Sequence, residues 1–220
     1  MRIVIAGGHG KIALLLGRLL TERGDTSVGL IRNPTQVRDL EDAGALAVVL
    51  DLEKSSVQQV ADALSGADAV VFAAGAGPGS GAARKQTVDR DAAILLADAA
   101  ESAGVPRYVM VSALAADDRS LDDGHDDDGY DEVFRAYMRA KSEADANVRA
   151  RTGLQTTIVR PGGLTDEPGT GRVRIADSTG RGTIPRADVA AVLVAVLDSP
   201  ATAGRTFEVI SGTLPIGEAL

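Results

Sequence analysis

The sequence lacks cysteine and tryptophan, and only 3% of its 220 residues are aromatic. The absence of cysteine excludes disulfide bonds, zinc sites built from thiolates and cysteine nucleophiles, and it is compatible with a reducing cytoplasm. Because aromatic rings are so scarce, the core must consist mainly of Ala, Val, Leu and Ile side chains. A core of this kind suits parallel strands that are covered on both faces by alanine-rich helices.

Long apolar runs and basic stripes are also missing. No stretch approaches the length of a membrane span, and the apolar run over residues 1–6 is too short for the core of a signal peptide. The formal net charge is −8, which repels the phosphate backbone of nucleic acids. We therefore expect a cytoplasmic protein with neither a membrane nor a nucleic acid as partner.

The first half of the chain contains a regular alternation of strands and helices. Short β-branched runs predict the strands, and segments with apolar residues at helical spacing separate them. Asn33 followed by Pro34 predicts a helix start, and Gly24, Gly44 and Gly104 predict helix ends. The predicted strands cover residues 2–6, 26–31, 46–50, 69–72 and 107–111, and the predicted helices include residues 12–20, 55–64 and 85–102.

This alternation predicts an α/β fold of the Rossmann type, in which a doubly wound parallel sheet lies between two helical layers in a single domain over residues 1–220. The second half adds predicted helices over residues 134–151 and 186–197 and predicted strands over residues 156–159 and 206–210.

Two segments of the second half predict loops. Residues 165–182 are rich in glycine and polar residues, which favours a loop or small lobe on the substrate side, within a C-terminal region of about residues 160–185. Residues 117–132 hold nine acidic residues in sixteen positions. A run of that density repels itself and predicts a solvated, mobile loop, which could act as a flap.

A glycine-rich turn follows the first predicted strand and opens the first helix. Gly7 suits a tight turn, and Gly10 lets a pyrophosphate approach the backbone. The amino end of the helix offers free N–H groups and the positive end of a dipole to the phosphates. The predicted cofactor-binding residues of this turn are Gly7, Gly8, His9, Gly10, Lys11 and Ile12.

The end of the second predicted strand indicates which dinucleotide binds. An acidic residue there would bind the 2′-hydroxyl of NAD, but this sequence has Arg32. A guanidinium offers a planar set of donors and a permanent charge, which suit the 2′-phosphate of NADP. The sequence therefore predicts NADP(H) as the preferred cofactor and NAD(H) as the second candidate. The alternative for Arg32 is a solvated surface side chain.

Tyr137 and Lys141 stand four residues apart in a predicted helix, which places both side chains on one face. A cationic lysine lowers the pKa of a neighbouring phenol, and the phenol exchanges a proton with the substrate oxygen during hydride transfer. Ser112, at the end of the fifth predicted strand, is placed to polarise a carbonyl in the same crevice. These three are the predicted catalytic residues. The alternative is a half-buried Tyr137 with a hydrogen-bonded hydroxyl, beside a Lys141 that contacts only cofactor or solvent.

The two histidines, His9 and His125, have no neighbouring pattern of ligands, so the sequence predicts no metal site.

Several motifs follow one another in a recognisable order and spacing, namely GGHGKIA, LIRNP, VVLDLE, VVFAAG, RYVMVSA, YMRAK, TIVRPGGL and IPRADVA. They resemble the atypical short-chain dehydrogenase/reductase superfamily, in particular its NmrA-like and biliverdin reductase B-like members. The resemblance covers about residues 1–211 and is specific for the fold and for an NAD(P)H cofactor.

The resemblance also implies roles for individual residues. Gly7, Gly10 and Lys11 would hold the pyrophosphate, and Arg32 the 2′-phosphate. The residues implied beside the adenine, the riboses and the nicotinamide are Asp51, Leu52, Ala73, Ala74, Gly75, Pro161, Gly162, Gly163 and Leu164, together with Ser112 and Lys141. Where typical catalytic members have an Asn in the fourth helix, this chain has Asp89 or Asp91, so no proton relay through this helix is implied.

The sequence leads to three functional hypotheses, each with a small molecule as partner and with monomer and homodimer both open. The first is an NADPH-dependent oxidoreductase that acts on a small carbonyl, quinone or similar acceptor. The second is a sugar-nucleotide epimerase or dehydratase, which keeps NAD tightly bound and usually has a larger C-terminal lobe than the roughly sixty residues after Arg160. The third is a redox sensor that binds NADP(H) and signals through a partner.

Overall fold

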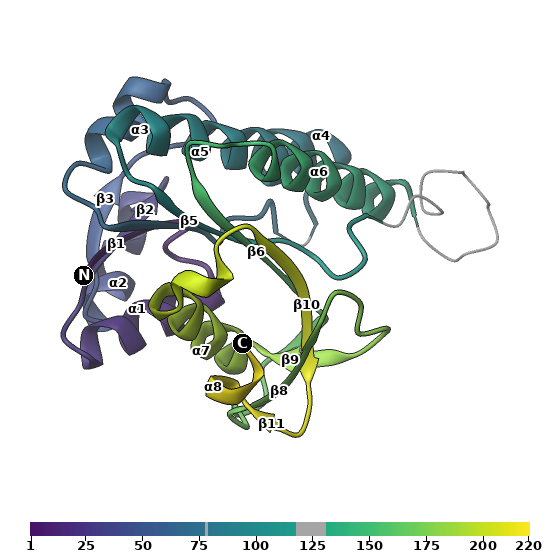
Figure 1. Ribbon diagram of the computed structural model, residues 1–220. Coiled ribbons are helices and arrows are strands. Elements are labelled where there is room, and N and C mark those ends of the chain that lie inside the picture. Colours follow the sequence, from purple (N-terminus) through teal and green to yellow (C-terminus); the bar gives the residue numbers. More distant parts are fainter. Residues whose placement is uncertain (78, 118–130) are drawn as a thin grey trace.

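The computed structural model describes residues 1–77, 79–117 and 131–220 (Figure 1). Pro78 and most of the predicted acidic loop, with its proposed flap role and His125, lie outside the described residues. The first half runs through β1 (Arg2–Ala6), α1 (Lys11–Glu22), β2 (Thr26–Ile31), η1 (Pro34–Gln36), α2 (Val37–Asp42), β3 (Leu46–Val49), α3 (Val57–Ala63), β4 (Ala69–Phe72), α4 (Ala82–Arg84), η2 (Lys85–Asp91), α5 (Ala92–Ala103) and β5 (Arg107–Val111).

The second half begins with the longest described helix and ends at the far edge of the sheet. Its elements are α6 (Glu132–Arg149), β6 (Gln155–Pro161), β7 (Gly163–Thr165), β8 (Arg172–Ala176), β9 (Thr183–Pro185), α7 (Arg186–Asp198), η4 (Pro200–Thr202), β10 (Arg205–Ser211), β11 (Leu214–Pro215) and α8 (Ile216–Ala219).

One large sheet runs through the described residues in the order β11-β8-β10-β6-β5-β4-β1-β2-β3. The strands from β3 to β10 are parallel, and β8 adds to β10 in the antiparallel direction. The chain leaves β1 for β2 on one side and later returns to β4 on the other side. In doubly wound sheets, ligands bind at the carboxyl ends of the strands where the order reverses in this way. Here that place lies between β1 and β4.

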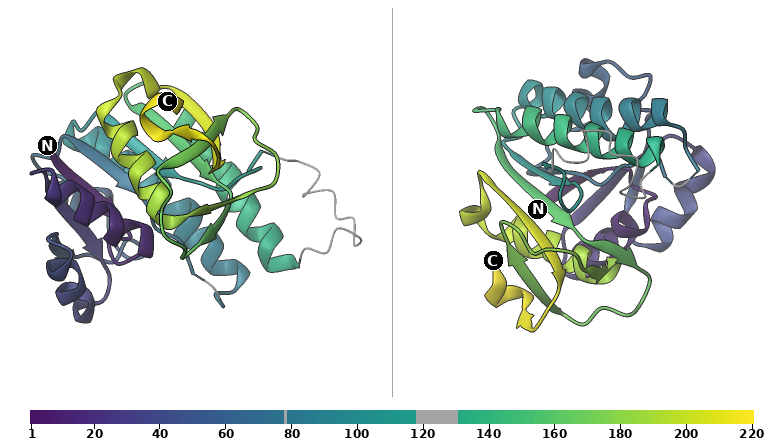
Figure 2. Two further views of the ribbon diagram at one scale, coloured as in Figure 1. Left: turned by 90° about the horizontal axis from the view of Figure 1, so that it is seen from below. Right: turned by 90° about the vertical axis from the view of Figure 1, so that its right-hand side faces the viewer.

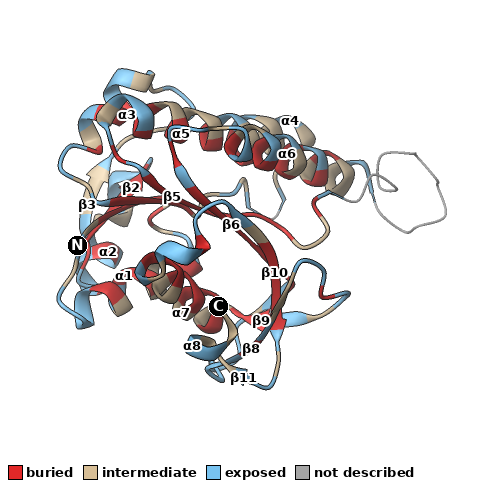
Figure 3. Ribbon diagram, viewed as in Figure 1, coloured by how far each residue is buried: buried red, intermediate tan, exposed pale blue. Residues whose placement is uncertain are grey.

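Helices cover the sheet on both faces, as the predicted three-layer fold requires. Helices α3, α5 and α6 lie on one face, and α1 and α7 pack side by side on the other (Figures 1 and 2). Each face has its own apolar core, and the central strands β2, β1, β4, β5 and β6 are buried almost throughout, whereas the edge strand β3 is not (Figure 3). Among the described residues, none of the helices combines the length and the apolarity that crossing a membrane requires. The prediction of a Rossmann-type α/β fold is confirmed.

Local hydrogen bonds explain where several helices begin. The Asn33 side chain accepts a hydrogen bond from Thr35 N at 3.0 Å, and Pro34 begins η1, as predicted. Ser56 caps α3 in a reciprocal capping box with Gln59. Asp131 Oδ1 accepts from Phe134 N at 2.7 Å at the start of α6. A capping side chain of this kind satisfies amides that the helix itself leaves unpaired.

The predicted helix over residues 85–102 forms, but it is not α-helical throughout. It begins as α4, widens into a π-helical segment over η2, and becomes regular in α5. Val88 and Asp89 are buried in this segment, which packs against α6. Because π-helical turns arise from tertiary packing and cluster at functional sites, local periodicity could not predict this one.

Residues 165–182 are not the simple loop that their composition predicts. They include β8, which extends the main sheet next to β10, and they join β7 to β9 in a separate two-stranded sheet. Buried carboxylates hold the turns around β8. Asp188 accepts from the backbone of Thr170 and Gly171, and Glu208 accepts from Thr179 N and Ala115 N. The glycines serve tight turns, while the polar residues satisfy these carboxylates.

Candidate active site

The glycine turn between β1 and α1 is packed so closely that two of its glycines have no room for a side chain. A Cβ on Gly7 would lie 2.5 Å from Ala74 Cα, and a Cβ on Gly8 would lie 2.6 Å from Gly29 Cα. Gly7 also adopts a left-handed φ of 78°. Gly7 therefore has the conformation that the sequence predicts, and Gly8 allows the turn to approach β2.

The amino end of α1 faces this turn without a side-chain cap. Gly10 is the N-cap residue, and no side chain of the described residues caps the helix there. The first-turn amides at Lys11 and Ile12 therefore resemble the anion seat of dinucleotide-binding folds. The Ile12 side chain itself points into the core, so its predicted role can only be served by its backbone.

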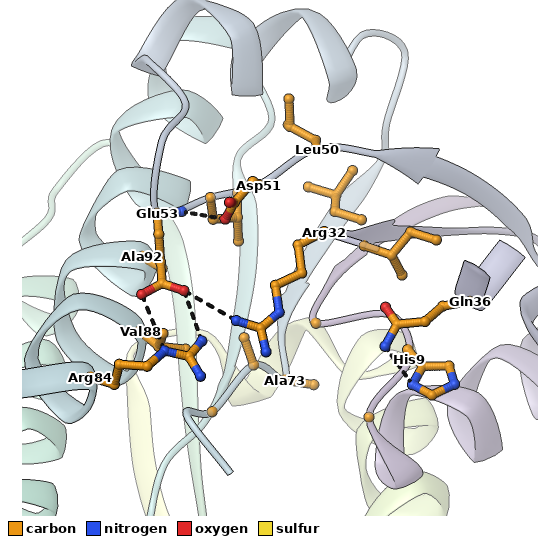
Figure 4. Close-up of a pocket in the computed structure, with 17 residues that line it drawn as sticks. His9, Arg32, Gln36, Leu50, Asp51, Glu53, Ala73, Arg84, Val88 and Ala92 are labelled. Carbon is orange, nitrogen blue, oxygen red and sulfur yellow. Dashed lines mark hydrogen bonds and ion pairs between the residues drawn. The ribbon is translucent and has the colours of Figure 1, made fainter. Parts of the chain in front are cut away.

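A pocket of about 250 Å³ opens beside the turn at the carboxyl ends of β1, β2, β3 and β4 (Figure 4). Nine predicted cofactor residues line it: Gly7, His9, Gly10, Arg32, Asp51, Leu52, Ala73, Ala74 and Gly75. The sequence prediction missed the remaining lining residues, which are Leu30, Ile31, Gln36, Leu50, Glu53, Arg84, Val88 and Ala92. The pocket combines small and apolar walls with a few charged groups, as nucleotide sites do.

Charged side chains gather at one end of the pocket around the Glu53 carboxylate. Arg84 Nη2 donates to it at 2.8 Å, Thr87 Oγ1 at 2.8 Å and Arg32 Nη1 at 3.4 Å. Hydrogen bonding to Arg84 is the main reason why the pKa of Glu53 lies below its ordinary value. The carboxylate is therefore ionised at neutral pH, and it touches the guanidinium groups of both Arg32 and Arg84.

His9 occupies the opposite side of the pocket mouth. Its Nδ1 lies 3.0 Å from the Gln36 side-chain nitrogen, and its Nε2 lies 2.7 Å from Asp39 Oδ2. If Gln36 donates to Nδ1, the ring must carry its proton on Nε2 and donate it to Asp39. These partners orient His9 beside the glycine turn.

Lys11 lies at the surface rather than in the pocket. Its Nζ lies 2.5 Å from Asp166 Oδ2, and Arg186 Nη1 lies 2.6 Å from the other oxygen of the same carboxylate. Lys11 begins α1 and Arg186 begins α7, so Asp166 joins two cations at the amino ends of neighbouring helices. Both cations are within reach of solvent, and their charge is partly neutralised by Asp166.

The predicted pair of Tyr137 and Lys141 lies on the inner face of α6, packed against η2. Lys141 is only 3% exposed, and its ammonium lies 5.8 Å from the centre of the Tyr137 ring. Asp89 of η2 is 1% exposed, and its Oδ1 lies 3.4 Å from Lys141 Nζ. The other oxygen of Asp89 accepts from Ala76 N at 3.2 Å, directly after the pocket residue Gly75. Asp89 thus connects the pocket wall to Lys141.

Tyr137 is half-buried, with Lys85 Nζ 5.2 Å from its ring centre. Burial is the main cause that raises the pKa of its phenol. The positive charge of Lys141 opposes this rise, and the negative charges of Asp89 and Asp145 add to it. The phenol therefore keeps its proton at neutral pH, which suits a proton donor.

Ser112 does not line the pocket, and its side chain faces α6. Its hydroxyl is buried and makes no hydrogen bond to any described residue. It faces the Asp145 carboxyl, whose pKa burial raises, while Arg160 and Ser112 oppose that rise. The approach of Ser112 to Asp145 falls short of hydrogen-bond geometry, so the hydroxyl keeps its bonding capacity.

The predicted nicotinamide-side residues Pro161 to Leu164 also lie outside the pocket, at the end of β6 and in β7. Gly162 N donates to Val209 O, and Gly163 N donates to Gly182 O. A Cβ on Gly162 would come within 2.4 Å of Gly182 O, so this glycine allows the backbone before β9 to approach the end of β6. Leu164 is exposed.

Comparison with known proteins agrees with this geometry. The chain matches the NAD(P)H-binding family over residues 7–200. It is 40% identical to a Bacillus subtilis protein named an uncharacterized sugar epimerase, YhfK, over 100% of this chain and 99% of that protein. These matches bear out the predicted resemblance and the NAD(P)H class of cofactor.

Solved structures share the whole fold. A putative NAD-dependent epimerase/dehydratase from Bacillus halodurans is 36% identical, with a TM-score of 0.89 over 99% of this chain and 97% of that one. The oxidoreductase ylbE from Lactococcus lactis is 26% identical, with a TM-score of 0.83 over 100% of this chain and 94% of that one. Fold, glycine turn and sequence agree, and the chain belongs to the NAD(P)H-binding family.

Proposed function

We propose that this chain is an NADPH-dependent oxidoreductase that reduces a small carbonyl, quinone or similar acceptor. The observation that carries the proposal is the protonated, half-buried Tyr137 beside the buried Lys141. Asp89 connects this pair to residues 75–76, which border the nucleotide pocket. A protonated phenol is the group that a reductase needs to complete the reduction of a carbonyl or quinone oxygen.

The residues of the glycine turn fit a dinucleotide. Gly7 and Gly8 leave no space for side chains, and the uncapped amides of α1 offer donors to a pyrophosphate. Arg32 would bind the 2′-phosphate, which favours NADP(H). When bound, NADPH supplies a hydride.

The chain's own residues would supply the proton and hold the acceptor. Tyr137 would donate its phenolic proton to the acceptor oxygen, and the Lys141 ammonium, held by Asp89, would stabilise the phenolate that remains. Ser112 has a buried hydroxyl that makes no hydrogen bond to any described residue, so it would be available as a further donor to the acceptor oxygen. Lys141, Asp89 and Ser112 are almost completely buried, which strengthens the electrostatic interactions among these groups.

The test is the loss of NADPH absorbance with a panel of quinones and aldehydes. Tyr137→Phe should lower the rate about a hundredfold or more, because general acid catalysis contributes on that scale. Tyr108→Phe is the matched control, since it also removes one buried hydroxyl, which donates to Ala93 O in the core. Equal rates for the Tyr137→Phe variant and the wild type would rule out the proton role, and no turnover of any acceptor would rule out the reductase proposal.

The names of the Bacillus subtilis and Bacillus halodurans proteins favour a second candidate, a sugar-nucleotide epimerase or dehydratase. Against it stands the described C-terminal region, where β8, β10, β11, α7 and α8 belong to the sheet and its helical layer and do not form a separate sugar-nucleotide lobe. An epimerase returns its cofactor to the starting redox state. Interconversion of nucleotide sugars with tightly bound NAD, and without net NADPH oxidation, would therefore identify this second function.

A further inference from the structure

The charged end of the nucleotide pocket contains a second arginine that no sequence motif marks. Arg84 is the last residue of α4, in the helical segment after β4, and Arg32 follows β2. Their guanidinium groups both contact the Glu53 carboxylate, which lies between them (Figure 4). Segments far apart in the sequence thus bring two cations and one anion to the same place.

These three side chains are accessible to a ligand. Arg32 is 56% exposed, Arg84 36% and Glu53 24%, and all three line the pocket. Their formal charges add up to +1, whereas the two arginines alone would present +2. A phosphate dianion that arrives at this end of the pocket therefore competes with Glu53 for the same donors.

A phosphate monoester is the ligand chemistry that best fits two convergent guanidinium groups, because each can offer paired N–H donors to phosphate oxygens. Arg32 follows β2, at the place where a side chain contacts the ribose 2′-substituent in dinucleotide-binding folds. A ribose 2′-hydroxyl would not need to displace the Glu53 carboxylate from the two arginines. A 2′-phosphate would have to displace it, because both anions use the same N–H donors. Glu53 is held by Thr87 as well, so it resists displacement.

The geometry points to Arg84 and Glu53 as the residues that tune discrimination between dinucleotides with and without a 2′-phosphate. Arg84 is the second cation for the phosphate, and Glu53 is an internal anion that competes with it and so moderates the preference set by Arg32. This inference rests on the proposed function in one respect only, namely that the adenosine half of the cofactor occupies this pocket.

Calorimetric titration with adenosine 2′,5′-bisphosphate and with 5′-AMP tests the inference, because the two ligands differ only in the 2′-phosphate. Glu53→Gln should strengthen bisphosphate binding about tenfold, and Arg84→Gln should weaken it about tenfold, which is the scale of one charge-assisted hydrogen bond. Binding of 5′-AMP should change less than about twofold in both variants. Arg90→Gln is the matched control, since Arg90 pairs with Asp91 and Glu143 and does not line the pocket.

Each other outcome overturns the inference. Equal changes for the two ligands would mean that Arg84 and Glu53 only shape the adenine wall, and weaker 5′-AMP binding by Glu53→Gln would mean that Glu53 binds the ribose hydroxyl. Thermal melting of each variant separates these outcomes from misfolding. The proposed NADPH preference is tested separately by the ratio of NADP⁺ to NAD⁺ affinity in the wild type. The ratio can equal one, which would contradict the NADPH preference, while Glu53→Gln still strengthens the binding of adenosine 2′,5′-bisphosphate.

Discussion

Lys141 Nζ lies 3.4 Å from Asp89 Oδ1, and both side chains are almost completely buried. A lysine of this kind usually presents an uncompensated positive charge to the tyrosine one turn away, which lowers the pKa of the phenol. Here Asp89 compensates that charge, and Lys141 also donates to Val111 O at 3.3 Å. The pair therefore holds the ammonium in place and keeps Tyr137 protonated.

Replacing Asp89 by Asn should lower the pKa of Tyr137. Burial, Asp89 and Asp145 raise this pKa and Lys141 lowers it, so removal of the Asp89 carboxylate takes away one of the contributions that oppose Lys141. Tyrosinate absorbance, followed during a pH titration in a Tyr130→Phe background, measures the change, because burial raises the pKa of Tyr108 far beyond the titrated range. A shift of about one unit is expected for one nearby charge.

The control for this titration is Asp91→Asn. Asp91 lies in the same π-helical segment but is half-exposed and pairs with Arg90, away from Tyr137. It should leave the titration unchanged. An Asp89→Asn variant whose Tyr137 pKa stays the same or rises would contradict the account. In turnover, Asp89→Asn should move the alkaline limb of the rate profile to lower pH, since the proton donor is lost once Tyr137 ionises.

The Asp166 carboxylate should weaken pyrophosphate binding by neutralising Lys11 and Arg186. Asp166→Asn frees both cations, so we expect NADPH to bind about two- to fivefold more tightly at low ionic strength, and the gain to shrink as salt is added. Fluorescence titration of NADPH measures this effect. Asp198→Asn, which removes a surface pair with Arg23 at the carboxyl end of α7, is the control. Weaker binding by Asp166→Asn would show instead that the carboxylate orients Lys11.

The close contact between Gly8 and Gly29 predicts a combined loss of stability and binding. An added methyl at Gly8 would meet backbone atoms of β2 at 2.6 Å, so Gly8→Ala must push the turn away from the sheet. We expect a destabilisation of about 2 kcal/mol, as for other overpacked sites, and weaker NADPH binding. Gly217→Ala is the control, because open space surrounds Gly217. A fully stable Gly8→Ala variant with normal binding would refute the packing argument.

Arg107 should matter for stability but not for cofactor binding. Its buried guanidinium donates to Gln155 O, Thr157 Oγ1, Val196 O and Thr202 Oγ1 at 2.8–2.9 Å, and desolvation lowers its pKa. Arg107→Met removes these four hydrogen bonds from the protein interior and should cost about 3–5 kcal/mol. Urea unfolding measures the loss, with the exposed Arg38→Met as control. A loss below 1 kcal/mol would contradict this structural role.

The sequence predicted the parts of the molecule that local chemistry determines. Strand and helix order, the left-handed Gly7 and the position of Arg32 at the end of β2 follow from periodicity, glycine and motif spacing. Predicted residues from four separate strand ends meet in one pocket because parallel strands end at the same edge of the sheet.

Tertiary packing determined what the sequence could not show. Glu53 follows β3 and Arg84 ends α4, and the two meet only because the chain brings these distant segments together at the pocket. The π-helical turn that buries Asp89 has no local signal. Ser112 ends β5 as expected, but its side chain turns toward Asp145 of α6. The glycine-rich composition of residues 165–182 concealed β8, because its strand pairing depends on β10.

We propose that one dinucleotide binds with its adenosine end at Arg32 and Arg84, its pyrophosphate at the glycine turn and its nicotinamide end at Tyr137 and Lys141. A crystal structure of the chain with NADPH tests it most directly. We expect the pyrophosphate against the amides of Lys11 and Ile12 and the nicotinamide ring beside the Tyr137 hydroxyl. A nicotinamide ring directed away from α6, or a pyrophosphate bound elsewhere, would contradict it.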